Sequence, residues 1–355
     1  MIPAELRQWG SEEFLGAPMP GASPAGTDWY RIADGFLGLD CDYGPVAQRW
    51  WEIYQDCRCA GPAGDLPSLY CVVRTQGSPD TARLDCEEDA SLDPIEFSLR
   101  ITPEQRLLEA SSPLPGWRFL ARAETPDLPF AGFRGGTVIL DRQQPWEHFV
   151  AHYSLHRLLR LQRNTMVFHA SGAAVNGSGV ILVGQKGSGK TTLSLALAAL
   201  GHSFFGDEFA AVRRDSGDLL PFRRAVSIRP GPAAAPVVAA INSGRYSPEV
   251  YPDGAPRFRI PASDLVDSAP ATPTPVRAIF FLRPLAQHAR VTAFQAGLEH
   301  VRLLSPLGST LADFSPAQTI SDFFRLLKRA RCYFLEPGGS PEETAEAIVR
   351  ALEAA

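Results

Sequence analysis

The stretch that decides the fold is GQKGSGKT, residues 184–191. It matches the pattern G-x4-G-K-[ST] at every fixed position. It lies between the apolar run 180–183 and a run of small and apolar residues that ends at Gly201. In a strand–loop–helix of this kind, glycines let backbone N–H groups surround a phosphate, and the helix amino terminus adds a partial positive charge. The stretch therefore predicts a nucleotide phosphate site within an α/β fold.

The residues expected to bind the nucleotide belong to this loop and to the helical turn that follows it. They are Gly184, Gln185, Lys186, Gly187, Ser188, Gly189, Lys190, Thr191 and Thr192. We expect the ammonium group of Lys190 to reach the β- and γ-phosphates and the hydroxyl of Thr191 to bind Mg²⁺. The pattern thus implies ATP as the phosphoryl donor and Mg²⁺ as the cofactor, whereas Lys186 either contacts phosphate or is only solvated.

The lysine content singles out the same loop. Of the 34 Lys and Arg residues, only Lys186, Lys190 and Lys328 are lysines. The ammonium of lysine is a compact point charge, whereas the guanidinium of arginine is a planar fork, so the two side chains serve different functions. A chain that otherwise uses arginine has therefore kept lysine where a point charge fits between phosphates.

Composition argues against two classes of partner. The formal net charge is −5, which provides no basic footprint for nucleic acid. No stretch approaches the roughly 18 apolar residues of a membrane span, and the first residues lack a basic and then apolar signal pattern. We therefore expect a cytoplasmic protein that binds neither nucleic acid nor membrane.

The length of 355 residues suggests about two domains. Residues 1–144 contain short apolar runs between turn residues, such as 69–73, 97–101 and 137–140, which predict a β-rich amino-terminal module. Residues 145–355, which contain the phosphate loop, are expected to form the catalytic α/β domain.

A hairpin is predicted immediately before the loop. Two apolar runs, 167–175 and 178–184, flank Asn176-Gly177, the strongest short signal for a two-residue type I′ turn. Such a turn pairs residues whose numbers sum to 353, which places His169 opposite Gly184. A longer turn would slip the register and turn His169 to the other face.

Two adjacent carboxylates, Asp207 and Glu208, end the next apolar run, seventeen residues after Lys190 (207 − 190). In phosphate-loop proteins, a carboxylate at the end of a neighbouring strand binds Mg²⁺ or its water, and a second group can activate the nucleophile. The pair therefore predicts one metal ligand and one base.

Missing motifs narrow the class of phosphate-loop protein. A guanine-specific switch needs an Asn-Lys-x-Asp element, but no lysine lies between Lys190 and Lys328. The LSGGQ-like signature of transporter ATPases is also missing. The remaining classes are a kinase that acts on small molecules or proteins and, as the alternative, an ATPase without phosphoryl transfer.

Four other segments carry structural predictions. Residues 145–164 have helical apolar spacing and carry a row of three histidines, His148, His152 and His156, which we interpret as a solvated or interdomain face. Residues 230–276, rich in Pro, Gly and Ala, are expected to be long loops over the site. Residues 276–282 are expected to form a strand. The sequence SPEE at 340–343 predicts a capped helix that runs to about residue 354.

Three pieces of sequence together resemble a known family. They are FHASG at 168–172, VGQKGSGKT at 183–191 and GHSFFGDE at 201–208. In this arrangement a histidine lies 21 residues before the loop lysine (190 − 169), and it resembles the carboxy-terminal kinase domain of HPr kinase/phosphorylase and the phosphoenolpyruvate-carboxykinase-like nucleotide fold. The pattern is nearer to the HPr-kinase-like enzymes that accompany ribosomally made, modified peptides. The likeness is best over 167–212 and does not extend to 1–140.

The resemblance implies a P-loop kinase that transfers the γ-phosphoryl group of ATP to a Ser or Thr hydroxyl of a peptide or small protein. It makes His169 an active-site residue near the γ-phosphate, Lys190 the phosphate-binding lysine and Asp207 the base. It also implies that Thr191 and Glu208 serve the metal, that the chain forms a homo-oligomer, and that residues 1–144 help to bind the peptide.

The sequence departs from the family at Ser227, which stands where the family has a metal-binding glutamate. Five arginines are candidates for stabilising the transferred charge: Arg223, Arg224, Arg229, Arg257 and Arg259. Two alternatives stay open, a kinase of a free metabolite such as serine and a nucleotide-dependent regulatory ATPase without phosphoryl transfer. A decarboxylating carboxykinase is a weaker third, because the chain is short for it.

Overall fold

The computed structural model describes 28–41, 44–61, 66, 68–74, 96–102, 107–111, 118–122, 131–134, 137–140, 151, 154–155, 158–159, 162–230, 235–250, 256–266, 272–304 and 316–354. The chain divides into two compact units. The first comprises 1–162 with 250–255, and the second comprises 163–249 with 256–355. The division at 144/145 expected from the sequence stays a prediction about the folding domains.

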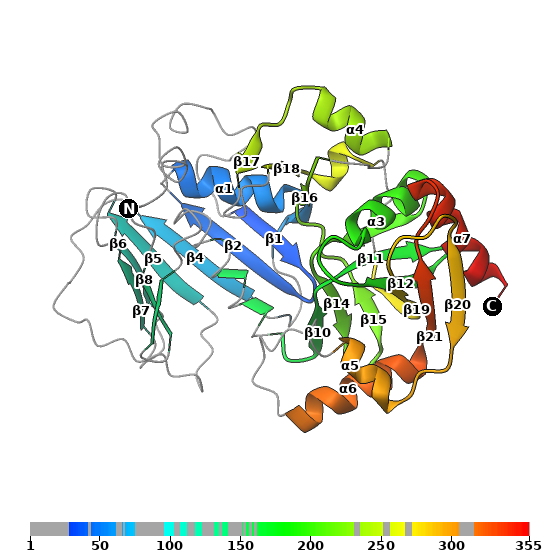
Figure 1. Ribbon diagram of the computed structural model, residues 1–355. Helices are drawn as coiled ribbons and strands as arrows, with labels where there is room; N and C mark the ends of the chain where they lie inside the picture. The colour runs from blue at the N-terminus through cyan, green and yellow to red at the C-terminus, as the bar shows by residue number, and fades with distance from the viewer. Residues whose placement is uncertain are drawn as a thin grey trace. The chain divides into compact units, whose positions relative to one another are not determined.

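The first unit contains a nine-stranded sheet with the order β3-β1-β2-β4-β5-β6-β7-β8-β9 (Figure 1). Its strands are β1 Asp28–Ile32, β2 Gly35–Cys41, β3 Arg58–Cys59, β4 Ser68–Arg74, β5 Glu96–Thr102, β6 Leu107–Ser111, β7 Arg118–Arg122, β8 Ala131–Arg134 and β9 Thr137–Leu140. The three apolar runs predicted to be strands are therefore confirmed as β4, β5 and β9.

Helix α1, Gly44–Tyr54, buries one face in this unit. Val46, Trp50, Ile53 and Tyr54 are nearly inaccessible to solvent and recur at the three- and four-residue spacing of a helix. Tyr54 also donates a hydrogen bond to the carbonyl of Ala151 at 3.1 Å. The packing of this single helical face thus fixes α1 in the unit.

The predicted helix over 145–164 is described at 151, 154, 155, 158 and 159, which are helical and buried, but residues 162–164 are not helical, so the predicted carboxyl end is wrong. That spacing agrees with the apolar face read from the sequence. His148, His152 and His156 lie outside the described residues.

The second unit is a mixed α/β structure built on another nine-stranded sheet. Its order is β10-β14-β15-β19-β12-β11-β13, with β21 beside β19 and β20 beside β21. The strands are β10 Thr165–Phe168, β11 Ala170–Val175, β12 Ser178–Val183, β13 Ser203–Gly206, β14 Ala210–Arg213, β15 Asp218–Leu220, β19 Thr274–Leu282, β20 Arg290–Phe294 and β21 Arg331–Glu336. Strand β19 confirms the strand predicted over 276–282.

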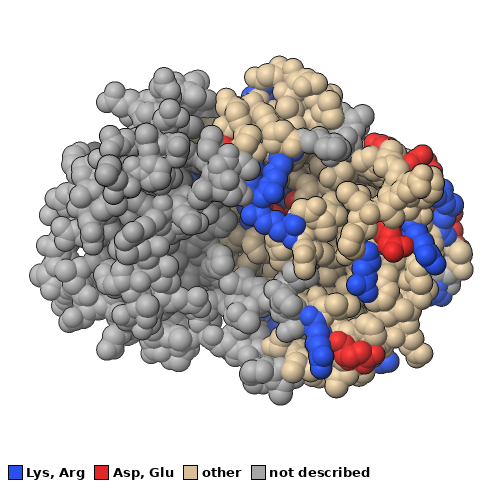
Figure 2. All heavy atoms as spheres, viewed as in Figure 1, with Lys and Arg blue, Asp and Glu red and all other residues tan. Residues whose placement is uncertain are grey.

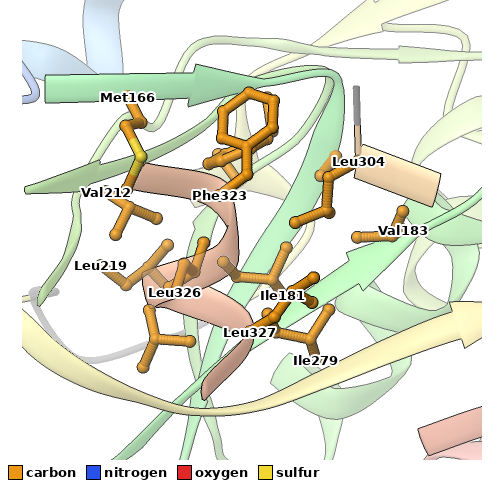
Figure 3. Close-up of a cluster of buried hydrophobic side chains, with 14 of the residues drawn as sticks. Met166, Ile181, Val183, Val212, Leu219, Ile279, Leu304, Phe323, Leu326 and Leu327 are labelled. Atoms are coloured by element: carbon orange, nitrogen blue, oxygen red, sulfur yellow. The ribbon is translucent and has the colours of Figure 1, made fainter. Parts of the chain in front are cut away.

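Helices cover both faces of this sheet (Figure 1). Helices α3, Lys190–Ala199, and α7, Pro341–Glu353, pack on one face together with side chains of β11, β12, β19 and β21. Helices α5, Val301–Leu304, and α6, Pro316–Arg329, cover the other face, where Phe323, Leu326 and Leu327 contact the sheet (Figure 3). Both faces of the sheet are thus buried, and a site can form only where the strands end.

The predicted hairpin and its register are confirmed. Pairs run from Ala170 with Val183 to Val175 with Ser178, so every pair sums to 353. Asn176 and Gly177 have φ of 49° and 76°, as both central positions of a type I′ turn require. The turn is therefore two residues long, and the register does not slip.

One part of the hairpin prediction is wrong, because the strand expected from 167 onward is interrupted at His169. Strand β10 pairs with β14, whereas β11 pairs with β12 and β13. The chain bends between these two sets of partners, so His169 lies just beyond the last pair of the hairpin instead of within it.

The prediction of long loops over 230–276 is also wrong. This region contains α4 Ala235–Asn242, β17 Pro248–Val250, β18 Pro256–Ile260 and the 3-10 turn η4 Ala262–Asp264. Strand β18 lies between β17 and β16, Val226–Ile228, and the resulting small sheet shares a core with α3. Proline is compatible with these elements because it stands at the first residue of β17 and of β18 and at the second residue of α4, where a missing N–H costs little.

Two predicted helices are capped at one end, α3 at its carboxyl end and α7 at its amino end. Gly201, with φ of 90°, ends α3 in a Schellman arrangement: its N–H bonds Ala198, and the N–H of His202 bonds Leu197. Ser340 and Glu343 form a reciprocal capping box at the start of α7. Local sequence therefore determines where these two helices begin and end.

Among the helices of the described ranges, none has the length and apolar character needed to cross a bilayer. On the face shown in Figure 2, blue and red side chains of the described residues are interspersed and form no continuous basic surface. The expected absence of nucleic acid and membrane partners stays a prediction.

Candidate active site

The register of the sheet brings three predicted segments to one edge. Strand β12 is parallel to β19, and β13 runs in the same direction as β12 because both are antiparallel to β11. The phosphate loop follows β12 and Asp207 follows β13. The amino end of β11, next to His169, lies at the same edge because Ala170 pairs with Val183. Carboxyl ends of parallel strands are where α/β folds place their ligands.

The loop uses glycine where its backbone requires it. Gly187 and Gly189 have φ of 84° and 95°, in the left-handed region that favours glycine. A side chain at Gly184 would begin 2.5 Å from the Ser188 hydroxyl and 3.1 Å from Cβ of Leu282. The loop is thus tightly closed at its base and left-handed at its crest.

Lys190 holds the loop closed. Its ammonium donates hydrogen bonds to the carbonyls of Gly184 at 2.9 Å and Gln185 at 3.0 Å. Burial lowers the pKa of Lys190, while Asp207 and Glu208 oppose that shift. The ammonium is therefore positioned over the loop and near the carboxylates.

The other loop residues differ in their exposure. Gln185, Lys186 and Gly187 are exposed, whereas Ser188, Gly189, Thr191 and Thr192 are half-buried. The crest is consequently open to a ligand, and the first turn of α3 forms its floor.

Asp207 is buried and bound by two hydroxyls. Thr191 donates to its Oδ2 at 2.8 Å, and Ser171 donates to its Oδ1 through a short contact. Burial raises the pKa of Asp207, and the neighbouring charge of Glu208 raises it further, although both hydroxyls oppose the shift. Asp207 is therefore a carboxylate with increased affinity for a proton, a property that favours a general base.

Glu208 has the opposite electrostatic character. Partial burial by itself would raise its pKa, but Arg224, then Arg259, His169 and Arg257 lower it, and the net pKa lies below its ordinary value. Arg224 reaches Oε2 of Glu208 at 3.1 Å. Adjacent carboxyl groups with opposite shifts are a pattern of sites that divide roles between two acids.

The backbone of Glu208 is strained. Its φ is 63°, an uncommon value for a residue with a side chain. Such conformations cost about 1–3 kcal/mol and cluster at functional sites. The strain turns the chain immediately after Asp207, so that the second carboxylate faces Arg224.

The five candidate arginines have different environments. Arg224 is buried, binds Glu208 and lies 5.3 Å from the ring centroid of Phe209. Arg259 forms two hydrogen bonds of 3.1 Å to Glu249. Arg229 is exposed. Arg224 thus forms a direct ion pair with the acidic pair, and Arg259 and Arg257 act electrostatically on the same carboxylate.

Two guanidinium nitrogens of Arg224, Nε and Nη1, are buried and have no hydrogen-bond partner within the described part of the chain. An unpaired buried donor costs free energy, so these nitrogens remain able to bind an anionic group that reaches them.

The donors at this edge suit Mg²⁺. No group of three or more His, Cys, Asp and Glu side chains gathers within the described ranges. The oxygens of Thr191 and Asp207 lie together instead. Mg²⁺ is commonly held by one or two protein oxygens together with water and substrate phosphates, so this sparse set fits that ion.

His169 is exposed, and its charge lowers the pKa of Glu208, which shows that it lies on the acidic side of the site. Ser171 was missed by sequence reasoning, although it stands two residues after His169. Its contact with Asp207 depends on the pairing of β11 with β13, which adjacent residues do not reveal.

Comparisons with known proteins add little to this geometry. No family model and no curated protein sequence matches the chain. Among solved structures, the HPr(Ser) kinase/phosphatase from Coxiella burnetii is similar to it, with 14% identity and a TM-score of 0.26. The match covers 53% of this chain and 96% of that one.

Proposed function

We propose that the chain is an ATP-dependent kinase that transfers the γ-phosphoryl group to a Ser or Thr hydroxyl of a peptide or small protein. One observation carries the proposal: the buried carboxylate of Asp207 is tied to Thr191 in the first turn after the phosphate loop. A base with a raised pKa therefore lies beside the place where the γ-phosphate of a loop-bound nucleotide would end.

In this reaction, Asp207 accepts the proton of the acceptor hydroxyl as that oxygen forms its bond to the γ-phosphorus. The bond between the γ-phosphorus and the β–γ bridging oxygen breaks, and ADP leaves with the electron pair. Ser171 and Thr191 hold the carboxylate in place through their hydrogen bonds. Catalysis of this kind rests mainly on positioning and electrostatic stabilisation.

The transferred charge is stabilised from two sides. Lys190 and the loop N–H groups would bind the phosphates from the α3 side, and Arg224 offers buried donors from the other side. Mg²⁺, when bound through Thr191, would neutralise charge on the phosphate oxygens. Glu208 either serves this metal or acts only through its ion pair with Arg224.

The peptide as acceptor rests on the resemblance described above and not on this geometry. The same holds for a peptide-binding role of residues 1–144, for the homo-oligomer and for the active-site role of His169. These remain proposals, and the experiment below includes the alternative acceptor.

The test is phosphoryl transfer from radiolabelled Mg·ATP to Ser- and Thr-containing peptides and to free serine, followed by intact-mass analysis. Wild type is compared with Asp207→Asn and with Glu346→Gln, a control on the exposed face of α7. We expect labelled peptide with wild type and the control, and a loss of about 10²–10⁴-fold with Asp207→Asn.

Two outcomes contradict the proposal. Label on free serine but on no peptide would identify a metabolite kinase. Slow ATP hydrolysis with every acceptor, unchanged in Asp207→Asn, would identify a regulatory ATPase without phosphoryl transfer.

A further inference from the structure

A guanidinium at the end of β19 lies over a pair of stacked aromatic rings, near the phosphate loop. Arg283 follows β19 directly, and its Cζ lies 4.0 Å from the ring centroid of Phe334. The Phe334 ring is stacked on Phe294, with centroids 4.1 Å apart and planes 11° from parallel. The His300 ring lies 4.7 Å from the Phe294 ring and is tilted by 36° to it. The stacked rings of Phe334 and Phe294 thus support one guanidinium at the strand end.

The strand register places Arg283 next to the loop. Phe281 pairs with Val183, so the residues that follow them, Leu282 and Gly184, lie side by side. The proximity of Cβ of Leu282 to Gly184 agrees with this placement. Arg283 is the next residue and therefore lies at the rim of the phosphate loop.

The guanidinium of Arg283 is available to a ligand. Arg283 is exposed, and among the described residues no carboxylate lies within ion-pair distance of it. Leu285, two residues later, is 83% exposed and is the most exposed large apolar side chain of the described ranges. A planar cation beside apolar surface is suited to binding a flat, electron-rich ring.

The topology decides which end of a nucleotide would lie here. In the proposed function the γ-phosphate points toward Asp207, which follows β13. Strands β13 and β19 lie on opposite sides of β12, because the order is β19-β12-β11-β13. The nucleoside end of the same ligand therefore extends toward β19 and β21, where Arg283 is found.

We propose that Arg283 is the stacking platform for the purine base of the phosphoryl donor, held flat by Phe334 and Phe294. The inference rests on the proposed nucleotide site and adds the part of the ligand that the loop does not contact. Stacking of a base on a planar side chain typically accounts for about 5- to 150-fold in affinity.

The experiment is calorimetric titration of two Mg²⁺-loaded ligands, ATP and inorganic tripolyphosphate, which has phosphates but no base. The proteins are wild type, Arg283→Ala, Arg283→Lys and the control Arg290→Ala on β20, which is also exposed. Thermal unfolding checks that each variant folds.

We expect Arg283→Ala to raise the Kd for ATP about tenfold and to leave the Kd for tripolyphosphate unchanged. Arg283→Lys is expected to weaken ATP binding similarly, because an ammonium has no planar face. Arg290→Ala should change neither ligand.

Equal weakening of both ligands by Arg283→Ala would show that Arg283 contacts phosphate, and would overturn the inference. An unchanged Kd for ATP would also overturn it. Failure of the proposed function looks different, since ATP binding would still depend on Arg283 while no acceptor is phosphorylated. A wild type that binds neither ligand would refute both.

Discussion

The hydroxyl of Thr191 donates a hydrogen bond of 2.8 Å to Oδ2 of Asp207. The contact joins the first turn of α3 to the end of β13, two elements predicted separately to hold the metal ligand and the base. A hydroxyl that donates its proton still has lone pairs for a cation, so Thr191 can bind Mg²⁺ and orient Asp207 together.

Replacing Thr191 with Val should impair both functions of this hydroxyl. Because the hydrogen bond lowers the pKa of Asp207, its loss should move the acidic limb of the kcat/KM profile to higher pH. The Mg²⁺ concentration needed for ATP binding should also rise. Thr191→Ser keeps the hydroxyl and should behave like wild type, and a limb that does not move in Thr191→Val would contradict the proposed coupling.

Asp207→Asn should stabilise the fold at neutral pH while it slows transfer by about 10²–10⁴-fold. The folded-state pKa of Asp207 is raised, so its contribution to stability is present below the ordinary value of 3.8 and is lost as pH rises through the folded value. The variant should therefore unfold at a higher temperature than wild type at pH 8, and at nearly the same temperature near pH 3. Thermal unfolding across this range is the measurement, with Glu346→Gln as the control. A difference that grows on acidification would mean that Asp207 is not destabilised by its burial.

Glu208→Gln should destabilise the protein, because it leaves the buried guanidinium of Arg224 beside a neutral partner. Buried pairs lose about 3–5 kcal/mol when broken, but the Glu208 side chain is 36% exposed, so we expect about 1–3 kcal/mol. The folded-state pKa of Glu208 is lowered, so its stabilisation is present above the ordinary value of 4.5 and is lost as pH falls through the folded value.

Chemical denaturation at pH 7 measures the loss of unfolding free energy in Glu208→Gln. This loss should become smaller on acidification. The same variant decides the role of Glu208 toward the metal. If Glu208 binds Mg²⁺, the Mg²⁺ dependence of ATP binding shifts, whereas a role limited to Arg224 leaves that dependence unchanged.

Gly184→Ala should disturb the loop because the new Cβ would lie 2.5 Å from the Ser188 hydroxyl. Such overpacking typically costs about 1–3 kcal/mol, and ATP binding should weaken with it. Ser188→Ala removes that hydroxyl, which is buried without a hydrogen-bond partner in the described part of the chain, so it should be nearly neutral by itself. The double variant should regain part of the affinity for ATP, and titration of the four proteins checks this. An equal loss in the single and double variants would locate the strain elsewhere, against Leu282.

Several predictions from the sequence agree with the structure because they depend on neighbouring residues. Asn176-Gly177 selects its turn through two positive φ angles, and the turn length then sets the register of the whole hairpin. Gly201 and Ser340 cap their helices through bonds to residues within a few positions. All the residues that decide such a turn or cap lie within a short segment, so the sequence alone predicts it.

The two errors have different causes. The proline content predicts loops over β17 and β18, but proline is the first residue of each strand, where a missing N–H is harmless. The apolar run predicts a continuous strand through His169, but the change of partners from β14 to β12 and β13 bends the chain there. The second error could not be avoided locally, because β14 is distant in sequence from the hairpin.

The sequence by itself determined the phosphate loop, the hairpin before it and the acidic pair after it, because each consists of contiguous residues. Only the tertiary structure decided that Ser171 binds Asp207, that Arg224 pairs with Glu208, and that Arg283 lies over the ring of Phe334. Those contacts join residues whose spacing in the sequence follows no helix or strand periodicity. They arise from the order of strands in the sheet, which packing across the whole unit selects.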